Sequence, residues 1–335
     1  RAAAHPERMK NRSLTAQITR TPRIFRTEQA EDARALFPDA APELGALIAG
    51  AGSVSPYLLS LMQKEADWAQ AAFDDPRAAI RAVIDGAGDV ASDQLATHLR
   101  QGKRRVALMT GLADLAGAWS LEDVTGALTD FADAACQAAL RAALEVQIKR
   151  GKLPGMTLED AQNGAGMVVL AMGKMGAGEL NYSSDIDLIC LYDDARYDPD
   201  DFHEVRQAMV RTTRNMCATL SDRTAHGYVF RTDLRLRPDP AVTPVCMPMA
   251  AAETYYESLG RTWERAAYIK ARPAAGDLAA GERFVAELRP FVWRRHLDFA
   301  AIQDAHDMRR AIRDHKGHHG AVTLPGHDMK LGRGG

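Results

Sequence analysis

Two aspartates, Asp185 and Asp187, are separated by one residue at the start of an apolar run that continues through 188–191. In a β-strand, residues two apart point to the same face, so the two carboxylates would lie side by side. Two adjacent carboxylates repel each other, and a divalent cation between them removes that cost. A solvated edge strand is the alternative, but the apolar continuation indicates a buried strand. The spacing therefore predicts a metal site.

A second segment, 228–237, alternates between charged and apolar residues, which predicts another strand. One face would carry Val229, Arg231, Asp233, Arg235 and Arg237, and the other Tyr228, Phe230, Thr232, Leu234 and Leu236. If this strand lies beside the first, Asp233 adds a third carboxylate to the metal site and the arginines can reach bound phosphates. The alternative is an exposed strand with salt bridges along one face.

A glycine-rich segment, Gly173 to Gly178, follows the apolar run 167–172 and contains Lys174. Ser183 and Ser184 come directly before the paired aspartates. Backbone amides in such a loop can bind phosphate oxygens. The segment is neither a Walker A motif nor a dinucleotide-binding motif, because no Gly-Lys-Ser/Thr ends it.

These parts together predict a nucleotidyltransferase site, in which a strand and a glycine-rich loop precede Asp-x-Asp and a later strand supplies one more aspartate. Two divalent ions held by three carboxylates would bridge nucleotide phosphates and align the nucleophile with the leaving oxygen. Phosphoryl and nucleotidyl transfer require little else from a protein.

The sequence also resembles a known family, the bifunctional glutamine synthetase adenylyltransferase/adenylyl-removing enzymes. The resemblance is carried by the segments 173–176, 178–189, 230–238, 255–257, 260–265, 269–272 and 290–298. The closing residues 330–335 resemble the start of a further family segment, so we expect the natural protein to continue beyond them. Members of this family carry two similar nucleotidyltransferase halves, and the helical lead-in here resembles that of the N-terminal, adenylyl-removing half.

The resemblance implies a reaction and a set of site residues. The removing half releases AMP from a tyrosine of glutamine synthetase by phosphorolysis, giving ADP, while the other half transfers AMP from ATP. Catalysis and Mg²⁺ binding would fall to Asp185, Asp187 and Asp233. Phosphate or nucleotide binding would fall to Gly173, Lys174, Ser183, Ser184, Arg235 and Arg237. The implied cofactors are two Mg²⁺ ions with ADP, ATP and inorganic phosphate, and the implied partners are glutamine synthetase and the PII signalling protein.

Two further groups of residues each allow two interpretations. Arg261 and Lys270 belong to a helically spaced set with Glu264 and Arg265, which either lines the nucleotide cleft or forms an ion-paired surface stripe. We favour the cleft on the resemblance. The histidines at 315, 318, 319 and 327 have no cysteine or carboxylate at ligand spacing and indicate a polar segment rather than a metal site.

The pattern of apolar and polar residues along the chain predicts an α+β fold, mostly α, with a nucleotidyltransferase-like α/β domain embedded between helical bundles. The predicted divisions are a helical region over 1–150, the catalytic domain over 151–248 and a second helical region over 249–335. Helices are expected over 56–76, 95–115, 120–149 and 201–222, and from 249 onward, including 284–302 and 308–312. Strands are expected over 167–172, 184–192 and 228–237.

The charge, hydropathy and cysteine content of the chain argue against several classes of function. The 335 residues include 42 Lys and Arg against 44 Asp and Glu, a net charge of −2, so no global basic field favours nucleic acid or an anionic membrane. No apolar run approaches a membrane span, and the four cysteines lie far apart, so we expect a cytoplasmic protein. Two other functions stay open: a PII-sensing module that binds nucleotide without catalysis, and a nucleotidyltransferase with a small molecule or tRNA as acceptor.

Overall fold

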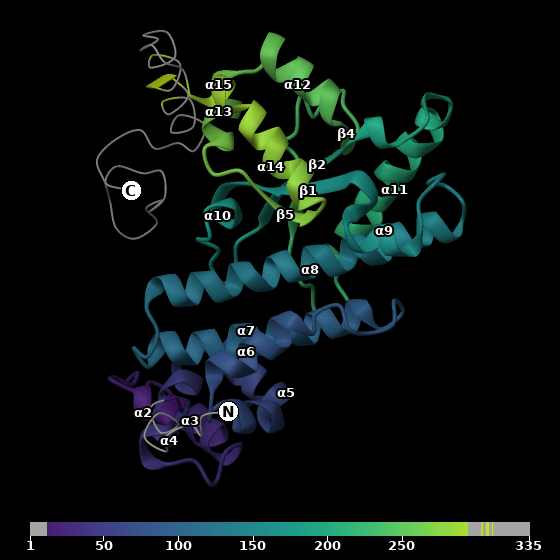
Figure 1. Ribbon diagram of the computed structural model, residues 1–335. Coiled ribbons are helices and arrows are strands. Elements are labelled where there is room, and N and C mark those ends of the chain that lie inside the picture. The colour runs from purple at the N-terminus through teal and green to yellow at the C-terminus, as the bar shows by residue number, and fades with distance from the viewer. Residues whose placement is uncertain (1–11, 294–302, 304–305, 308–309, 311–335) are drawn as a thin grey trace, which may run out of the picture.

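The chain is mostly helical, with one small mixed sheet in its second half (Figure 1). The computed structural model describes residues 12–293 together with 303, 306, 307 and 310. The fold class predicted from the sequence, α+β and mostly α, is confirmed. The predicted divisions near 150 and 248 stay predictions.

The first half of the chain forms helices whose starts follow from local capping. Ser55 accepts a hydrogen bond from the Leu58 backbone N–H at 3.2 Å, just before Pro56 opens a helix. Ser120 and Asp123 form a reciprocal capping box at the start of the longest helix. The helices are α2 Leu14–Gln17, α3 Thr27–Ala35, α4 Pro42–Val54, α5 Pro56–Ala72, α6 Pro76–Asp85, α7 Leu95–Leu115 and α8 Leu121–Lys149.

Helices α7 and α8 form a long pair between the smaller N-terminal helices and the sheet (Figure 1). They approach closely at Gly102 of α7, where an added Cβ would lie only 2.8 Å from the Phe131 ring of α8. The pair therefore joins the helical region to the sheet through one continuous core.

The sheet has the order β3-β2-β1-β5, and β4 pairs with a further part of β2. Strand β1 is antiparallel to both β2 and β5, whereas β3 and β4 run parallel to β2. The strands are β1 Met167–Ala171, β2 Ile186–Tyr192, β3 Thr232–Asp233, β4 Cys246–Pro248 and β5 Arg272–Gly276.

Helices cover both faces of the sheet, which explains why β1 and β2 are almost continuously apolar. Met167 and Val169 of β1 join the core formed with α7 and α8, whereas Val168 and Leu170 join a second core on the opposite face. The first face is also covered by α11 Phe202–Ser221, and the second by α12 Met249–Ser258 and α14 Leu278–Glu287. Short helices complete the described part: α9 Leu158–Gln162, α10 Gly173–Gly176, α13 Thr262–Tyr268 and α15 Arg289–Val292.

Three expectations about elements differ from the structure. The strand predicted over 228–237 is limited to Thr232–Asp233, because Val229 and Phe230 are both buried and the expected alternation fails there. The glycine-rich segment forms a helical turn, α10, rather than an open loop. Strands β4 and β5 were not predicted. The helical residues expected beyond 293 and the four histidines lie outside the described residues.

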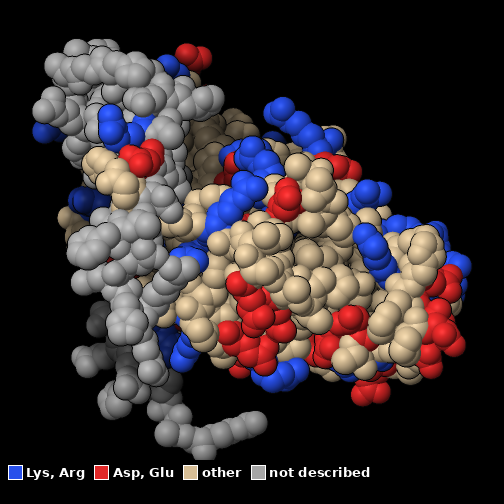
Figure 2. Space-filling model, turned by 90° about the horizontal axis from the view of Figure 1, so that it is seen from above, with Lys and Arg blue, Asp and Glu red and all other residues tan. Residues whose placement is uncertain are grey.

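The charged side chains show no single dominant sign on the face seen in Figure 2, where basic and acidic residues are both present. This mixture agrees with the near-zero net charge. Among the described helices, none has the length and apolarity needed to cross a membrane.

Candidate active site

A tight glycine turn places backbone against one of the predicted metal ligands. The turn α10 begins at Gly173, whose φ of 55° lies in the left-handed region. An added Cβ at Gly173 would lie 2.9 Å from the Asp187 carboxylate Oδ2. Glycine is therefore required here both for its conformation and for this close approach. Lys174, next in the turn, is exposed.

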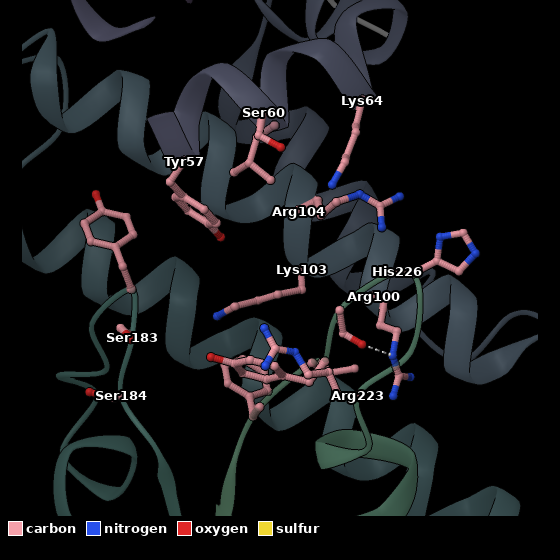
Figure 3. A pocket seen from close by; sticks show the side chains of 16 residues that line it. Tyr57, Ser60, Lys64, Arg100, Lys103, Arg104, Ser183, Ser184, Arg223 and His226 are labelled. Atoms are coloured by element: carbon pink, nitrogen blue, oxygen red, sulfur yellow. Dashed lines mark hydrogen bonds between the residues drawn. The ribbon is translucent and has the colours of Figure 1, made fainter. Parts of the chain in front are cut away.

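The loop that leads to the aspartates is held by the long helices α7 and α8. The Leu180 backbone N–H donates to Thr129 Oγ1 of α8 at 3.3 Å. The Tyr182 hydroxyl donates to Asp114 Oδ2 of α7 at 3.1 Å. Ser183 and Ser184 follow in this loop and border a pocket that faces α5 and α7 (Figure 3). The helical region thus positions the loop that leads to the paired aspartates.

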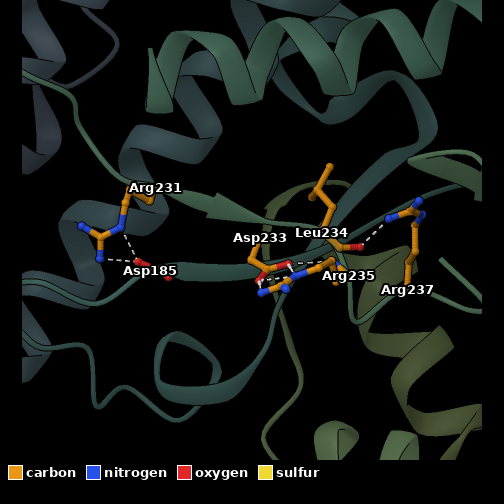
Figure 4. A network of polar contacts seen from close by, with 6 residues as sticks. All are labelled: Asp185, Arg231, Asp233, Leu234, Arg235 and Arg237. Carbon is orange, nitrogen blue, oxygen red and sulfur yellow. Dashed lines mark hydrogen bonds and ion pairs between the residues drawn. The ribbon is translucent and has the colours of Figure 1, made fainter. Parts of the chain in front are cut away.

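The structure places two of the three predicted carboxylates opposite each other at the start of β2, and the third lies just before that strand. Strands β2 and β3 are parallel, and Asp187 is the register partner of Asp233. Asp185 lies one residue before β2 and pairs with Arg231, apart from the Asp233–Arg235 pair (Figure 4). The condition set by the sequence, that the strand bearing Asp233 lies beside the strand of the paired aspartates, is met.

Arginines balance two of these carboxylates. Arg231 donates from Nε to Asp185 Oδ1 at 2.6 Å, and its other nitrogens donate to the Ser183 carbonyl and the Tyr228 hydroxyl. Arg235 donates from Nε to Asp233 Oδ2 at 2.9 Å. The hydrogen bonds from Arg235 lower the pKa of Asp233 below its usual range, so this carboxylate stays ionised at neutral pH.

Three aspartates could supply carboxylate oxygens to a hard divalent cation. In this structure, however, two of the carboxylates are paired with arginines, Asp185 with Arg231 and Asp233 with Arg235. Within residues 12–293, no three His, Cys, Asp or Glu side chains stand grouped to hold a metal ion. Carboxylate oxygens are the ligands Mg²⁺ prefers. The Arg235 side chain is 84% exposed and can swing away from Asp233 without loss of packing. The assignment of Asp185, Asp187 and Asp233 as metal ligands stays a prediction.

The other predicted phosphate and nucleotide residues are spread around this centre. The Arg237 guanidinium donates to the carbonyls of Leu234, Pro240 and Thr243, so it stabilises its own loop (Figure 4). Lys270 pairs with Glu179 at 2.7 Å, beside the glycine turn.

Arg261 precedes α13, and its backbone N–H donates to the buried Glu264 at 2.7 Å. Of the set with helical spacing, Lys270 contacts Glu179, which directly follows the glycine-rich segment.

Sequence reasoning missed how Arg272 fixes the glycine turn. Its guanidinium pairs with Asp133 of α8 at 2.8 Å and donates to the Met175 carbonyl at 3.1 Å. Its partners lie 139 and 97 residues away along the chain, so no local spacing indicated them.

Comparison with known proteins gives one consistent result. The family model described as glutamate-ammonia ligase adenylyltransferase matches residues 46–287. Three relatives are each named bifunctional glutamine synthetase adenylyltransferase/adenylyl-removing enzyme. One from Bradyrhizobium sp. (strain BTAi1) is 54% identical over 237 residues, which cover 71% of this chain and 24% of the relative.

The other two come from Rhodopseudomonas palustris (strain TIE-1) and Rhizobium meliloti (strain 1021). The first is 50% identical over 246 residues, covering 73% of this chain and 25% of the relative. The second is 50% identical over 242 residues, covering 72% and 24%. The chain spans about a quarter of the length of these relatives. Since the matched residues include the glycine turn and all three aspartates, the centre built here is part of what this chain shares with the glutamate-ammonia ligase adenylyltransferase family, to which it belongs.

Proposed function

We propose that this chain removes AMP from an adenylylated tyrosine of glutamine synthetase by phosphorolysis, as the adenylyl-removing half of a bifunctional enzyme. The observation that carries the proposal is the pairing of Asp187 with Asp233 in register, beside the backbone of Gly173. Family membership supports the class of chemistry, because the relatives' names include both adenylyl transfer and adenylyl removal.

The reaction exchanges one phosphorus–oxygen bond for another. An oxygen of inorganic phosphate attacks the α-phosphorus of the AMP-tyrosine and forms the new bond of ADP. The bond from phosphorus to the tyrosine oxygen breaks, and the phenolate takes up the proton that the attacking phosphate loses. The products are ADP and unmodified tyrosine, so atoms and charges balance.

The residues divide this work between metal and phosphate binding. Asp185, Asp187 and Asp233 would hold Mg²⁺, which when bound neutralises charge on the phosphates and orients the reacting oxygens. The turn at Gly173 and Lys174 and the hydroxyls of Ser183 and Ser184 would bind phosphate oxygens. Arg235, released from Asp233, would then be available to the transferred phosphate group.

Separate observations favour removal of AMP from glutamine synthetase over its attachment. The same carboxylates could align either a phosphate or a tyrosine hydroxyl against the α-phosphorus, so their geometry alone does not fix the direction. The helical region before the site resembles that of the removing half. The pocket beside Ser183 and Ser184 is lined by lysine and arginine, which suits a separate phosphate anion. We also propose the PII signalling protein as a partner and the cytoplasm as the location.

The test is to incubate the chain with adenylylated glutamine synthetase and Mg²⁺, with and without inorganic phosphate. The expected result is loss of AMP from the substrate only with phosphate, and ADP as the product. The chain carrying Asp187→Asn serves as the inactive comparison.

Three results would contradict the proposal. Free AMP released without phosphate would indicate hydrolysis. Labelling of unmodified glutamine synthetase by ATP would identify the transferring half. Nucleotide binding with no turnover in either direction would favour the non-catalytic, PII-sensing module.

A further inference from the structure

A cationic pocket lies between the N-terminal helices and the segment that leads into β3. Its volume is about 260 Å³. Helices α5 and α7 form one wall, and the loop with Ser183 and Ser184 and the residues around Tyr228 form the others (Figure 3). The volume lies below the ~300–1,000 Å³ typical of pockets for drug-sized ligands, so a small occupant fits best.

Five cationic side chains and no carboxylate occur among the residues that line this pocket. They are Lys64, Arg100, Lys103, Arg104 and Arg223. Two are already engaged, since Arg100 donates to backbone carbonyls and Arg104 pairs with Glu65 at 2.7 Å. Lys64 and Arg223 form no ion pair with any described residue. The pocket therefore has excess positive charge.

Among the residues of this pocket, Lys103 gives the strongest support for an anion-binding role. It projects from α7 toward the loop of Ser183, and its residue is 9% exposed (Figure 3). Its Nζ lies 4.0 Å from the centroid of the Phe230 ring, and no hydrogen bond or ion pair joins it to another described residue. This burial lowers the pKa of Lys103 to about 7. A buried ammonium is costly unless an anion pairs with it.

The pocket adjoins the carboxylate centre through the loop that they share. Ser183 and Ser184 border the pocket and directly precede Asp185. Arg231 bridges the two, because it donates to Asp185 and also to the Ser183 carbonyl and the Tyr228 hydroxyl. An anion beside Lys103 would therefore sit next to the metal-binding aspartates, on the side of the helical region.

We propose that this pocket is a subsite for a phosphate group, with Lys103, Lys64 and Arg223 as its cationic ligands. Hydroxyl donors at its wall, Tyr57, Ser60 and Ser183, suit the several oxygens of a tetrahedral anion better than a single carboxylate. The assignment of that phosphate as the nucleophile rests on the proposed function, whereas the binding of the anion does not.

The direct test is calorimetric titration of inorganic phosphate into the chain without metal or nucleotide. We expect saturable binding that Lys103→Met weakens at least about tenfold, as expected for a lost charge-assisted hydrogen bond. Lys149→Met is the matched control, since Lys149 ends α8 with a side chain that is 58% exposed. Equal affinity in the wild-type chain and Lys103→Met would overturn the proposal.

Competition between anions tests whether the pocket selects a tetrahedral oxyanion. Sulfate should compete with phosphate, whereas chloride at equal ionic strength should not; equal displacement by chloride would show non-specific binding and overturn the subsite. If Lys103→Met does not fold, the double variant Lys64→Met/Arg223→Met, at two exposed residues, replaces it, with the same expected loss of phosphate affinity.

Titration of ADP at saturating phosphate identifies which phosphate the subsite binds. Undiminished ADP binding supports free inorganic phosphate, and competition between the two assigns the subsite to a phosphate group of the nucleotide.

Activity measurements separate this proposal from the proposed function. If phosphate is the nucleophile, Lys103→Met raises KM for phosphate by a larger factor than it lowers kcat. Phosphate binding that depends on Lys103 in a chain that removes no AMP would refute only the function. Phosphate-dependent removal that Lys103→Met leaves unchanged would refute only the subsite.

Discussion

At the scale of single residues, the site is balanced by pairs of opposite charge. Asp185 pairs with Arg231 and Asp233 with Arg235. Repulsion between Asp185 and Asp187, expected from their spacing, is therefore offset before any metal binds. Replacing one aspartate should relieve little repulsion and should remove an ion pair instead.

Asp185→Asn should separate activity from stability. If Asp185 holds Mg²⁺ as proposed, turnover should fall at least about 100-fold, because a ligand that contributes several kcal/mol is lost. The unfolding free energy should fall by no more than about 1 kcal/mol, because the Asp185–Arg231 pair is half exposed. Assays and thermal melts of one preparation check both. Asp130→Asn, on an exposed aspartate 3.6 Å from Arg81, is the control; a large loss of stability in Asp185→Asn alone would make the aspartate structural.

Gly173→Ala tests the close approach to Asp187. The positive φ of Gly173 should cost roughly 1–2 kcal/mol of stability with alanine. The new methyl group should also displace the Asp187 carboxylate and lower turnover strongly. Gly178→Ala provides the matched control, because Gly178 has a φ of 73° and open space where its Cβ would be. Equal turnover in the two variants would mean that the contact with Asp187 does not matter.

At the scale of elements, the sequence predicted helices better than short strands. Helices α7 and α8 match their predicted ranges because their caps and apolar spacing are local signals. Strands β4 and β5 have three and five residues and depend on pairing with β2 and β1, which lie far away in the sequence. The segment 228–237 alternates in type, but packing of Val229 and Phe230 overrides that pattern.

The contact between α12 and α14 should make stability depend on pH. Burial and a hydrogen bond with Glu287 raise the pKa of Glu253 to about 7. The folded chain thus holds a proton between about pH 4.5 and 7 that the unfolded chain releases, so this group's contribution to stability falls as pH rises through that range.

Glu253→Gln should therefore melt about 2 °C higher than the wild-type chain at pH 8, with no difference near pH 4.5. Glu282→Gln, on the exposed side of α14, should show no such dependence. A constant difference across the pH range would exclude this titration as its cause.

At the scale of the whole molecule, Arg100 joins the helical region to the sheet region. It is 2% exposed and donates from α7 to the carbonyls of Thr219, Asp222 and Gly227. Arg100→Met should lower the unfolding free energy by on the order of 3 kcal/mol, because several part-buried carbonyls lose a charged donor. Chemical denaturation measures this, with the exposed Arg81→Met as control. A change under about 0.5 kcal/mol, as for an ordinary surface substitution, would contradict the role.

The contacts of α7 with distant residues also show which part of the candidate site could not be predicted from the sequence. The spacing within each segment singled out the three aspartates as candidate ligands and the glycine-rich segment before them, which forms a helical turn rather than the expected loop. The pocket depends on Lys103 of α7 meeting residues some 80 to 127 positions later in the sequence, and no local pattern encodes that contact. Helical periodicity predicted a helix over 95–115, but not that a lysine would be buried on it.

The hydrogen bond from Leu180 to Thr129 has a consequence for the motions of the loop that leads to the paired aspartates. An exposed loop ordinarily exchanges its amide hydrogens through its own small openings. The Leu180 amide can exchange with solvent only when the loop separates from α8, whose Thr129 is buried. Its exchange rate, measured by hydrogen–deuterium exchange, should therefore follow the separation of this loop from α8 rather than the faster rates of its exposed neighbours. Slow exchange at Leu180 would thus report how firmly the loop before the aspartates is held on the helical region.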